Sequence, residues 1–450
     1  MRKFAYSILI ITIMISGLLS LKHAQADTYV NGTIYVNTIW ANANSPYTLT
    51  DNVIISDGAT LTVESGVTVN FGAYEIYVNG ILNAQGSSDN TTVFSGNGYS
   101  SITFTSASID WSGTSGCIID NAYFSLVSLV VEDSSPKISN NYFTSTYDPL
   151  ITISGGSPLI SNNILVFDSA DCIRVNSGSS PIISYNVIAG EGQYFGIYTE
   201  GTAYISNNNI TGCWSGIYEL GASTIQYNNI MANANDGIRS ENAASTIQNN
   251  VLANNNVGIT GTGIIRDNTI ANNGVAGIWG PLPSAEITRN NIYANSQNVH
   301  LTELYNITAV NNWWGTTDAS AINQTIWDHK NDPINLGTLD FIPYLTDPNS
   351  LAPSIPSFMI IPPPPTISTP TPTPTATPTP LVTPTPDTSV TPSPSSPTLT
   401  PSPTLGPTET PSEPPDQLEI TDVTGIVVIF VAFLLALIII VFINRKYGKN

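Results

Sequence analysis

The sequence predicts an all-β fold, a parallel β-helix of roughly 12 coils. An Asn followed two positions later by a large apolar residue recurs from Asn121 to Asn311, at steps of 18 to 23 residues. Within each step, short stretches of alternating apolar and polar residues are separated by turn residues, and none is long enough for an amphipathic helix. Three strands and three turns therefore close each coil, and each coil contacts only its neighbours.

The coil around Asn186 shows how the strands are assigned. Residues 182–183 form a strand before the Asn, residues 187–188 form a second after it, and residues 196–198 form a third. Because side chains alternate along a strand, one apolar residue in each of the last two strands should point into the coil. These inward residues are Phe143, Leu165, Ile173, Ile188, Ile197, Ile210, Ile217, Ile230, Ile238, Leu252, Ile259, Ile270, Ile278 and Ile292.

The recurring Asn has two expected structural roles. Asn tolerates the left-handed backbone conformation, so we expect it to form the sharp bend between two strands. Stacked at the spacing of neighbouring strands, about 4.8 Å, its amides can also hydrogen-bond to one another as a ladder. The predicted ladder residues are Asn163, Asn186, Asn208, Asn228, Asn250, Asn268 and Asn290.

Residues 45–345 resemble the right-handed parallel β-helix superfamily, the pectate-lyase-like proteins that include NosD-like surface proteins. The segment 58–86, GATLTVESGVTVNFGAYEIYVNGILNAQG, is similar to the first coils of that superfamily, and residues 311–345 are similar to its terminal cap. The resemblance implies a right-handed coil. It implies no single activity, because the superfamily includes lyases, hydrolases, adhesins and structural proteins.

A C-terminal cap is also expected from the residues themselves. Asp318 stands where a helix N-cap is favoured, and Trp313 and Trp314 lie just before it. A short amphipathic helix here would cover the apolar end of the last coil, since an open strand edge invites aggregation. The residues at helical spacing are Ala319, Ile322, Ile326 and Trp327.

The N-terminus has the pattern of a secretory signal peptide, predicted at residues 1–26. Arg2 and Lys3 precede an apolar stretch at residues 5–21, and the small-residue pattern at residues 24–26 resembles a cleavage site. The β-helix with its N- and C-terminal caps is then assigned to residues 27–350.

The C-terminal part predicts a membrane anchor. Residues 351–418 are rich in Pro, Thr and Ser and predict a disordered, extended stalk. Residues 423–443 are uncharged and long enough for a transmembrane helix, and residues 444–450 are basic. We therefore expect a single-pass type I protein in the cell membrane, with most of the chain extracellular and an envelope of archaeal type.

Charge and modification signals bear on the partners. The net charge is −20, which argues against nucleic acid as a partner. A cell-envelope or extracellular polysaccharide or glycoprotein remains compatible with it, and the membrane is expected as a partner through the C-terminal helix. The candidate N-glycosylation sites are Asn31, Asn90, Asn209, Asn306 and Asn323.

The strongest functional signal is a row of residues next to the inward Ile of the third strand. Both neighbours of that Ile should point outward, and one is usually Gly, which we expect to leave the adjacent ring accessible. Aromatic rings at the coil spacing can stack on sugars, and Arg can bind hydroxyl or carboxylate groups; cross-strand stacking that only stabilises the sheet is the alternative. The predicted ligand-binding residues are Arg174, Tyr198, Tyr218, Arg239 and Trp279, with Thr260 in the same row.

Catalysis would need a group of carboxylates on one outer face. Asp168 and Asp171 lie near Arg174, and adjacent coils are expected to bring Glu200 and Glu219 near one edge. These four acids are the catalytic candidates. No metal site or cofactor is predicted; Ca²⁺ would suit carboxylates, but no motif supports it.

These observations favour a cell-surface β-helix protein with a non-catalytic glycan-binding, adhesion or surface-layer role. Two alternatives remain open at this point. One is a polysaccharide lyase or glycoside hydrolase acting on extracellular polysaccharide, and the other is a purely structural spacer in the envelope.

Overall fold

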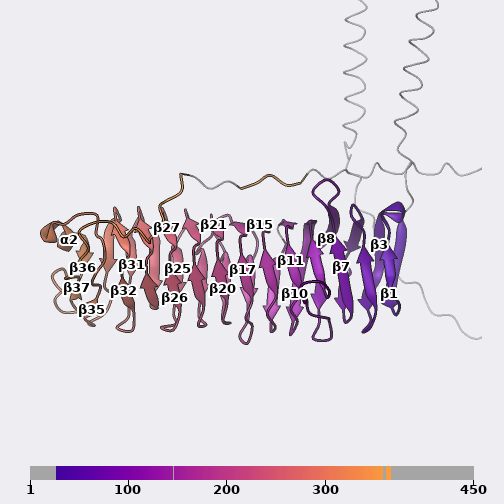
Figure 1. Cartoon of the computed structure of the whole chain (residues 1–450), viewed down its shortest axis with the longest axis horizontal. Helices are drawn as coiled ribbons and strands as arrows, with labels where there is room; N and C mark the ends of the chain where they lie inside the picture. Colours follow the sequence, from indigo (N-terminus) through magenta and orange to yellow (C-terminus); the bar gives the residue numbers. More distant parts are fainter. Residues whose placement is uncertain (1–26, 145, 358–360, 366–450) are drawn as a thin grey trace, which may run out of the picture. The chain divides into compact units, whose positions relative to one another are not determined.

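The computed structural model describes residues 27–144, 146–357 and 361–365. Within them the chain is almost entirely β-structure wound into a parallel β-helix, as predicted (Figure 1). The predicted signal peptide, the transmembrane segment 423–443, the tail 444–450 and most of the stalk lie outside the described residues. Within the described part, no helix is long and apolar enough to cross a membrane.

Face 1 is the 12-stranded sheet, whose neighbouring strands are all parallel and each come from a different coil. A sheet of 12 strands corresponds to the roughly 12 coils predicted. The strands of face 1 are β2 (Thr38–Trp40), β4 (Thr60–Val63), β7 (Ile81–Gln85), β9 (Ile118–Asp120), β11 (Lys137–Ser139), β14 (Leu159–Ser161), β17 (Ile182–Ser184), β20 (Tyr204–Ser206), β23 (Thr224–Gln226), β26 (Thr246–Gln248), β29 (Ile264–Arg266) and β32 (Glu286–Thr288).

Face 2 follows face 1 along the chain in each coil. Its strands are short and again parallel, and from β12 onward each begins next to the recurring Asn. They are β5 (Thr68–Gly72), β12 (Tyr142–Phe143), β15 (Ile164–Val166), β18 (Val187–Ala189), β21 (Asn209–Thr211), β24 (Asn229–Met231), β27 (Val251–Ala253), β30 (Thr269–Ala271) and β33 (Asn291–Tyr293).

Face 3 completes the coil, so the prediction of three strands per coil is confirmed from the middle of the domain onward. Its strands are β6 (Ile76–Val78), β13 (Ile151–Ser154), β16 (Ile173–Val175), β19 (Ile197–Thr199), β22 (Ile217–Glu219), β25 (Asp236–Ser240), β28 (Val257–Gly261), β31 (Ala276–Trp279), β34 (Gln297–His300) and β36 (Ile326–Trp327).

The first coils are built differently, because some of their strands run through face 2 and face 3 without a break. One such strand, β10, pairs with β12 at one end and with β13 at the other. The long strands are β1 (Thr28–Ile34), β3 (Tyr47–Ile55), β8 (Thr92–Phe104) and β10 (Ala122–Glu132), and a short 3-10 helix, η1 (Asn42–Asn44), precedes β3.

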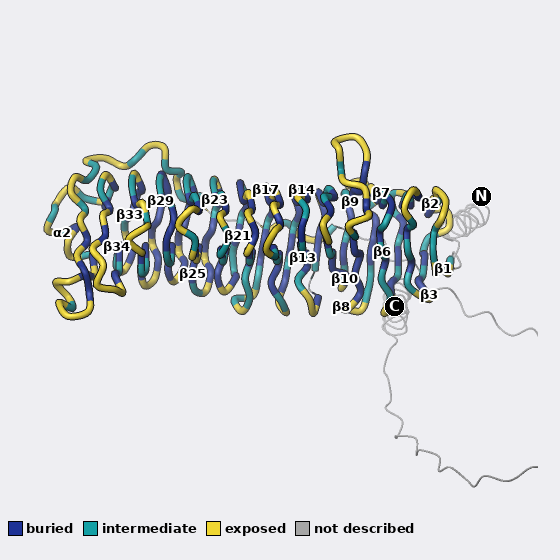
Figure 2. The backbone as a smooth tube through the Cα atoms, turned by 90° about the horizontal axis from the view of Figure 1, so that it is seen from below, coloured by how far each residue is buried: buried dark blue, intermediate teal, exposed yellow. Residues whose placement is uncertain are grey.

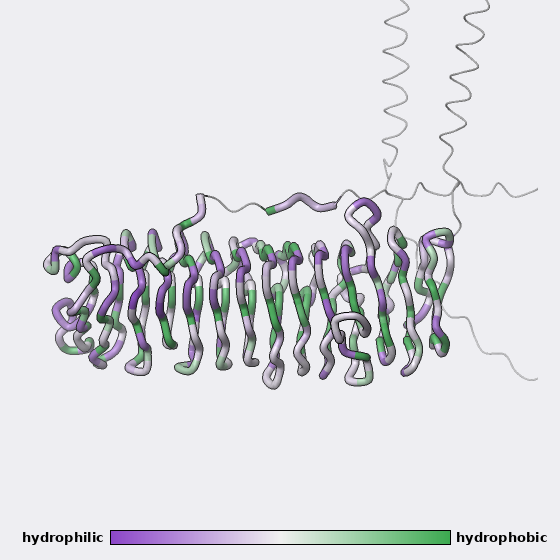
Figure 3. The backbone as a smooth tube through the Cα atoms, viewed as in Figure 1, coloured by the Kyte–Doolittle hydropathy of each residue, from purple (hydrophilic) through white to green (hydrophobic). Residues whose placement is uncertain are grey.

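The core is the continuous interior of the coil, and all of the apolar residues predicted to point inward in faces 2 and 3 are fully buried. Apolar residues lie along the strands (Figure 3), and exposed residues gather mainly at the turns and ends (Figure 2). Buried and more exposed side chains alternate along many of the strands, as in β16 and β19. The alternation is what lets each short strand contribute one side chain to the interior and one to the surface.

The recurring Asn residues form a ladder at the bend between face 1 and face 2. Asn186 is representative: its Nδ2 donates to Oδ1 of Asn208 at 3.0 Å and to the carbonyl oxygen of Ile160 at 3.0 Å. Because these amides are buried, such bonds satisfy backbone groups that a sharp bend leaves unpaired. The ladder contains Asn141, Asn163, Asn186, Asn208, Asn228, Asn250, Asn268, Asn290 and Asn312.

The expected left-handed conformation belongs to a different residue. The residue before each ladder Asn takes positive φ, 59° at Tyr185 and 56° at Arg289, so the bend prediction was wrong by one position. Asn121 and Asn311, the outermost marks of the sequence period, have positive φ themselves and precede the ladder position. Most of these preceding residues are Asn or Asp, which tolerate this backbone conformation, whereas Tyr185, Tyr227 and Arg289 are of types that disfavour it. At those three positions the hydrogen bonds of the following Asn help to hold the bend.

A second Asn ladder lies at the bend between face 2 and face 3 and was not predicted. Asn233 Nδ2 donates to Oδ1 of Asn255 at 3.0 Å, and Asn273 Nδ2 donates to Oδ1 of Asn295 at 2.8 Å. The signal was available, because each of these residues follows a first-ladder Asn by five positions.

The C-terminal end contains α2 (Ala319–Gln324), β35 (Ile307–Thr308) and β37 (Leu339–Asp340). Asp318 accepts hydrogen bonds from the backbone N–H groups of Ser320 and Ala321, as expected of an N-cap. The predicted helix was too long, because it ends at Gln324. The next residues form β36, which pairs with β34 and continues face 3 instead.

Candidate functional site

The strand register of face 3 places the predicted ligand-binding residues opposite one another on successive coils. Arg174 pairs with Tyr198, Tyr198 with Tyr218, and Tyr218 with Arg239. Thr260 comes next and then Trp279. We call this row, with His300 and Trp327 which extend it, the face-3 stripe.

His300 and Trp327 were missed because the local pattern changes. Earlier stripe residues from Tyr198 onward follow Gly-Ile, whereas His300 follows Asn298 and Val299, and Trp327 belongs to a segment that the spacing assigned to a helix. The signal that could have found them is the coil period itself, since each occupies the same register position on face 3.

In the first half of the stripe, two tyrosine rings lie between two arginine side chains. The guanidinium of Arg174 lies 4.6 Å from the ring centre of Tyr198, and that of Arg239 lies 5.1 Å from the ring centre of Tyr218. The two tyrosine rings meet edge to face, with centres 5.5 Å apart. These arrangements are attractive in themselves, so contacts within the protein hold the rings in place.

Carboxylates neutralise this part of the stripe. Asp171 accepts from Arg174 Nη2 at 2.7 Å, and Glu241 Oε1 accepts from Arg239 Nη2 at 2.9 Å. Glu200 accepts from the Tyr198 hydroxyl at 2.7 Å; burial and this hydrogen bond raise the pKa of Tyr198 to about 12. Each arginine of this part of the stripe is therefore paired with a carboxylate.

The second half of the stripe is a stack of three rings. Trp279 and His300 have centres 3.8 Å apart, and His300 and Trp327 have centres 5.7 Å apart with planes only 3° from parallel. Burial lowers the pKa of His300, and its Nδ1 lies 2.6 Å from Gln297 Oε1. One face of the Trp279 ring is consequently covered by His300.

Between the two halves, Thr260 is too short to fill its position, and a cleft of about 270 Å³ opens there. Arg239 and Trp279 line it from the two neighbouring coils. The full lining is Asn235, Asp236, Arg239, Asn256, Val257, Thr260, Val275 and Trp279. The cleft is slightly smaller than the ~300–1,000 Å³ of pockets for drug-sized ligands, so it suits a single ring-sized group.

Asp236 lines this cleft and is held in place by several hydrogen bonds. Its Oδ1 accepts from Thr260 Oγ1 at 2.5 Å, and its Oδ2 accepts from Ser215 Oγ at 3.2 Å and from Asn235 Nδ2 at 3.0 Å. The side chain is almost fully buried, and burial raises its pKa. Its bonds hold Thr260 and Asn235 in fixed orientations around the opening.

The glycines beside the stripe do not have the role that was expected. At Gly216 an added Cβ would lie 2.6 Å from Ile230 Cγ2 and 2.7 Å from the carbonyl oxygen of Gly237, so the position is closed by the core and the next coil. Gly237, Gly258 and Gly277 are similarly close to the following coil. These glycines permit close coil packing and are not spacers that leave a ring accessible.

The four catalytic candidates do not come together. Glu219 is completely buried on the inner side of β22, where Ser240 Oγ donates to its Oε2 at 2.7 Å, so it cannot reach an extended substrate. Glu200 is exposed, and Thr199 rather than Glu200 pairs with Glu219. Alternation along the strand separates the two residues to opposite sides, which corrects the expected shared edge.

Asp168 and Asp171 also differ in their surroundings. Asp168 is exposed, whereas Asp171 is nearly buried and accepts from the Phe195 backbone N–H at 3.1 Å as well as from Arg174. Across the described residues, no group of three or more His, Cys, Asp or Glu side chains could hold a metal ion. Of the predicted ligand-binding residues, Arg239 and Trp279 line a shared opening, the Thr260 cleft.

The candidate glycosylation sites differ in accessibility. Asn209 is half-buried in face 2, where its Oδ1 accepts from Asn229 Nδ2 at 2.9 Å. The other candidates lie on the surface; they are Asn31, Asn90, Asn306 and Asn323.

Residues 195–335 match a family model described as "Right handed beta helix region". No curated protein matches the chain. Two solved structures are similar to it: a mutant of the periplasmic alginate epimerase AlgG has 14% identity and a TM-score of 0.30, covering 66% of this chain and 74% of its own. The A-module of the Azotobacter vinelandii mannuronan C-5 epimerase AlgE4 has 12% identity and a TM-score of 0.24, and the match covers 72% of this chain and 89% of its own. From its strand pairing and the matched region, the chain is a right-handed parallel β-helix protein.

Proposed function

We propose that face 3 is a non-catalytic glycan-binding surface centred on the Thr260 cleft. The observation that carries the proposal is the gap in the stripe: Thr260 leaves an opening between Arg239 and Trp279 on the two adjacent coils. Because His300 covers one face of the Trp279 ring, the face toward Thr260 is the one available to a ligand. A sugar ring can stack on that face while its hydroxyl groups hydrogen-bond at the rim.

The polar groups of the cleft favour a neutral glycan. Asn235 and Asn256 can both donate to and accept from hydroxyl groups, and Arg239 is already paired with Glu241. A uronate would have to compete with Glu241 for the guanidinium and approach a chain of net charge −20. An uncharged sugar with many hydroxyl groups does not need to displace Glu241 and is not repelled by the net negative charge.

The remainder of the stripe would extend the contact along the axis of the β-helix. Tyr218 and Tyr198 precede Trp279 by three and four coils in the strand register, and their hydroxyl groups are held by Glu241 and Glu200. A linear polysaccharide lying along face 3 could contact these groups in turn. This proposal includes the adhesion and surface-layer roles expected from the sequence, because both depend on the same contact.

We also propose the cellular setting that the sequence predicts. A signal peptide at 1–26, a stalk after the β-helix and an anchor at 423–443 would hold the binding face outside the cell membrane. In this setting α2 and the residues around it would cover the last coil. Export of the protein and its retention in the membrane fraction, compared with release when residues 423–450 are removed, would test this part.

The binding proposal is tested by screening the full-length protein on a glycan array of neutral and acidic saccharides. We expect binding to a neutral glycan, loss of binding in Trp279→Ala, and unchanged binding in Tyr204→Ala, a matched exposed aromatic on face 1. Equal binding by wild type and Trp279→Ala would contradict the proposal. Release of reducing or unsaturated ends from a bound polysaccharide would instead favour the lyase or hydrolase alternative.

A further inference from the structure

A segment after the last coil returns along face 2, and this arrangement supports a second binding site. We call residues 349–355 the strap. It lies beside the C-terminal coils, where Figure 1 shows the chain running from the α2 end toward β27. The sequence assigned residues 351–418 to the stalk, so the part up to residue 355 belongs instead to the surface of the β-helix.

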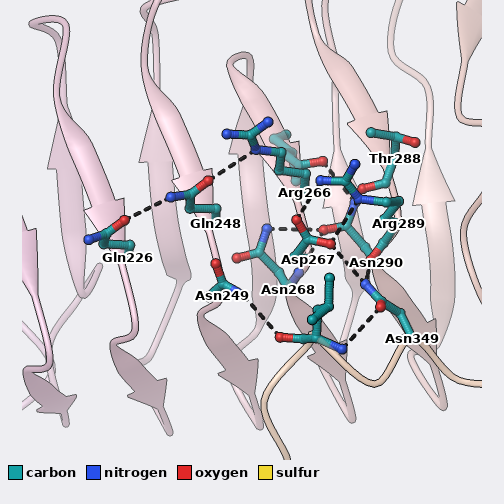
Figure 4. A network of polar contacts seen from close by, with 12 residues as sticks. Gln226, Gln248, Asn249, Arg266, Asp267, Asn268, Thr288, Arg289, Asn290 and Asn349 are labelled. Carbon is teal, nitrogen blue, oxygen red and sulfur yellow. Dashed lines mark hydrogen bonds and ion pairs between the residues drawn. The ribbon is translucent and has the colours of Figure 1, made fainter.

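Asn349 anchors one end of the strap. Its backbone N–H donates to Asn291 Oδ1 at 2.7 Å, and Asn291 Nδ2 donates back to its carbonyl oxygen at 3.1 Å. Its side-chain Nδ2 donates to Asp267 Oδ1 at 3.0 Å, and Asp267 is held in turn by Arg289 at 2.7 Å (Figure 4). The Arg289 hydrogen bond lowers the pKa of Asp267, so this acceptor stays ionised.

Further along, side chains of the β-helix bind the main chain of the strap. Asn249 Nδ2 donates to the carbonyl oxygen of Leu351 at 2.9 Å, and Thr269 Oγ1 donates to that of Pro353 at 2.6 Å. The bound carbonyls belong to alternate residues, as expected for an extended peptide. Pro353 has no N–H, so this stretch leaves fewer backbone donors to satisfy.

An apolar contact completes the site. Ile355 packs against Met231, Val251 and Ala253, which form a small cluster separate from the main core. Val251 and Ala253 flank the inward Leu252 and therefore point out of the β-helix, yet both are completely buried. The surface under the strap, which we call the groove, therefore has polar anchors at one end and an apolar patch at the other.

These contacts are those of a bound peptide rather than of a strand. In the described residues, each hydrogen bond between the strap and the β-helix uses a side chain of one partner, and the strap adds no strand to any sheet. Removing the strap would therefore leave the sheet ladders intact. It would expose a polar and apolar groove that already matches an extended peptide.

We propose that this groove on β24, β27, β30 and β33 is a peptide-docking site for the strap sequence, and that the strap of a second copy of the chain can replace the resident one. The resident strap is tethered close by, so its effective concentration is high and a free peptide competes poorly with it. Binding in trans should appear when the resident strap is weakened. The site lies on face 2 and is independent of the glycan proposal for face 3.

The test uses the full-length protein carrying Asn349→Ala and Ile355→Asp, and a fluorescent peptide with the wild-type sequence of residues 346–357. Fluorescence anisotropy should detect binding to this variant at least tenfold tighter than to the wild-type protein, whose groove is occupied. A peptide carrying the same two substitutions is the ligand control and should not bind. Circular dichroism checks that the variant retains the β-helix.

The groove is tested by adding Thr269→Val to the strap-weakened protein. This change keeps the shape of the side chain and removes the donor to Pro353, so the peptide affinity should fall several-fold. A folded strap-weakened protein that does not bind the peptide would overturn the proposal, as would peptide binding that is indifferent to Thr269→Val. Failure of the strap-weakened protein to fold would also overturn it, because the strap would then be an integral part of the fold.

Discussion

The indole ring of Trp279 stacks on the imidazole ring of His300, with centres 3.8 Å apart and planes inclined by 13°. The stack fixes the orientation of Trp279 beside the Thr260 cleft. Aromatic pairs of this kind contribute about 0.5–1.5 kcal/mol beyond the area that they bury. Any ligand that uses the open face of Trp279 should therefore depend indirectly on His300.

His300→Ala should weaken glycan binding by roughly 2- to 10-fold, because the indole ring loses the partner that orients it. His300→Phe should retain most of the affinity, since a ring of similar size preserves the stack without a titratable group. Calorimetric titration of both variants with a glycan identified on the array checks the prediction. Equal affinity for His300→Ala and wild type would mean that the stack has no role in positioning Trp279.

Glu219 should make stability depend on pH. Burial raises its pKa from 4.5 to about 7, so the folded state holds the proton more tightly than the unfolded state. The stabilisation is complete below pH 4.5 and is lost as the pH rises through about 7, to an extent on the order of 3 kcal/mol. Denaturant unfolding at about pH 5 and about pH 8 should show this loss in wild type and a much smaller one in Glu219→Gln. The same change of stability with pH in both proteins would show that Glu219 is not its source.

Gly216 should not tolerate a side chain. An added Cβ would meet Ile230 and the Gly237 carbonyl at less than 3 Å, so Gly216→Ala should cost about 1–3 kcal/mol of unfolding free energy. Gly274 is the matched control, because its nearest neighbour is Asn256 Oδ1 at 3.6 Å and its backbone is unstrained. Gly274→Ala should change stability by less than about 0.5 kcal/mol. Denaturant unfolding of both variants checks this prediction. Equal unfolding midpoints for Gly216→Ala and Gly274→Ala would contradict the close packing of the coils.

The buried Asn ladder should matter far more than the polar row on the outside of face 1. Asn228 bonds to Asn208 and Asn250, so Asn228→Ala would leave buried groups unpaired and should cost about 3 kcal/mol. Gln248 bonds to Gln226 at 2.7 Å and to Arg266 at 3.0 Å on the surface (Figure 4), where water can replace it. Gln248→Ala should therefore cost less than about 1 kcal/mol. Thermal unfolding of both variants measures the two losses of stability. A smaller loss for Asn228→Ala than for Gln248→Ala would contradict the importance of the ladder.

The sequence period predicted the features that repeat in every coil. Ile188 and Ile197 are buried, and the stripe residues Tyr198 and Tyr218 are paired, because the period of two along a strand and the coil length together determine which way each side chain points. Short-range pattern was less informative at the bends. Tyr185 takes a left-handed backbone conformation that its residue type disfavours, and the following Asn186 fixes the bend through hydrogen bonds to Asn208 of the next coil.

The features that lie outside the repeat could not be predicted in the same way. The Thr260 cleft depends on the absence of a large side chain between two larger ones, which becomes visible only when the register is known. The bond from Asn349 to Asp267 joins residues 82 positions apart, and no local pattern marks either one. Glu219 and Glu200 were expected at one edge. The strand register pairs Glu219 with Thr199, one residue before Glu200, and Glu219 is buried inside the coil.

The central claim, that the gap at Thr260 is where a glycan binds, is tested most directly by filling it. Thr260→Trp fills the cleft with a large side chain and leaves Arg239, Trp279 and the other lining residues unchanged. Calorimetric titration with the glycan selected on the array should show at least a tenfold loss of affinity for Thr260→Trp and no change for Tyr204→Ala. Unchanged affinity for Thr260→Trp would place the binding site elsewhere and contradict the account.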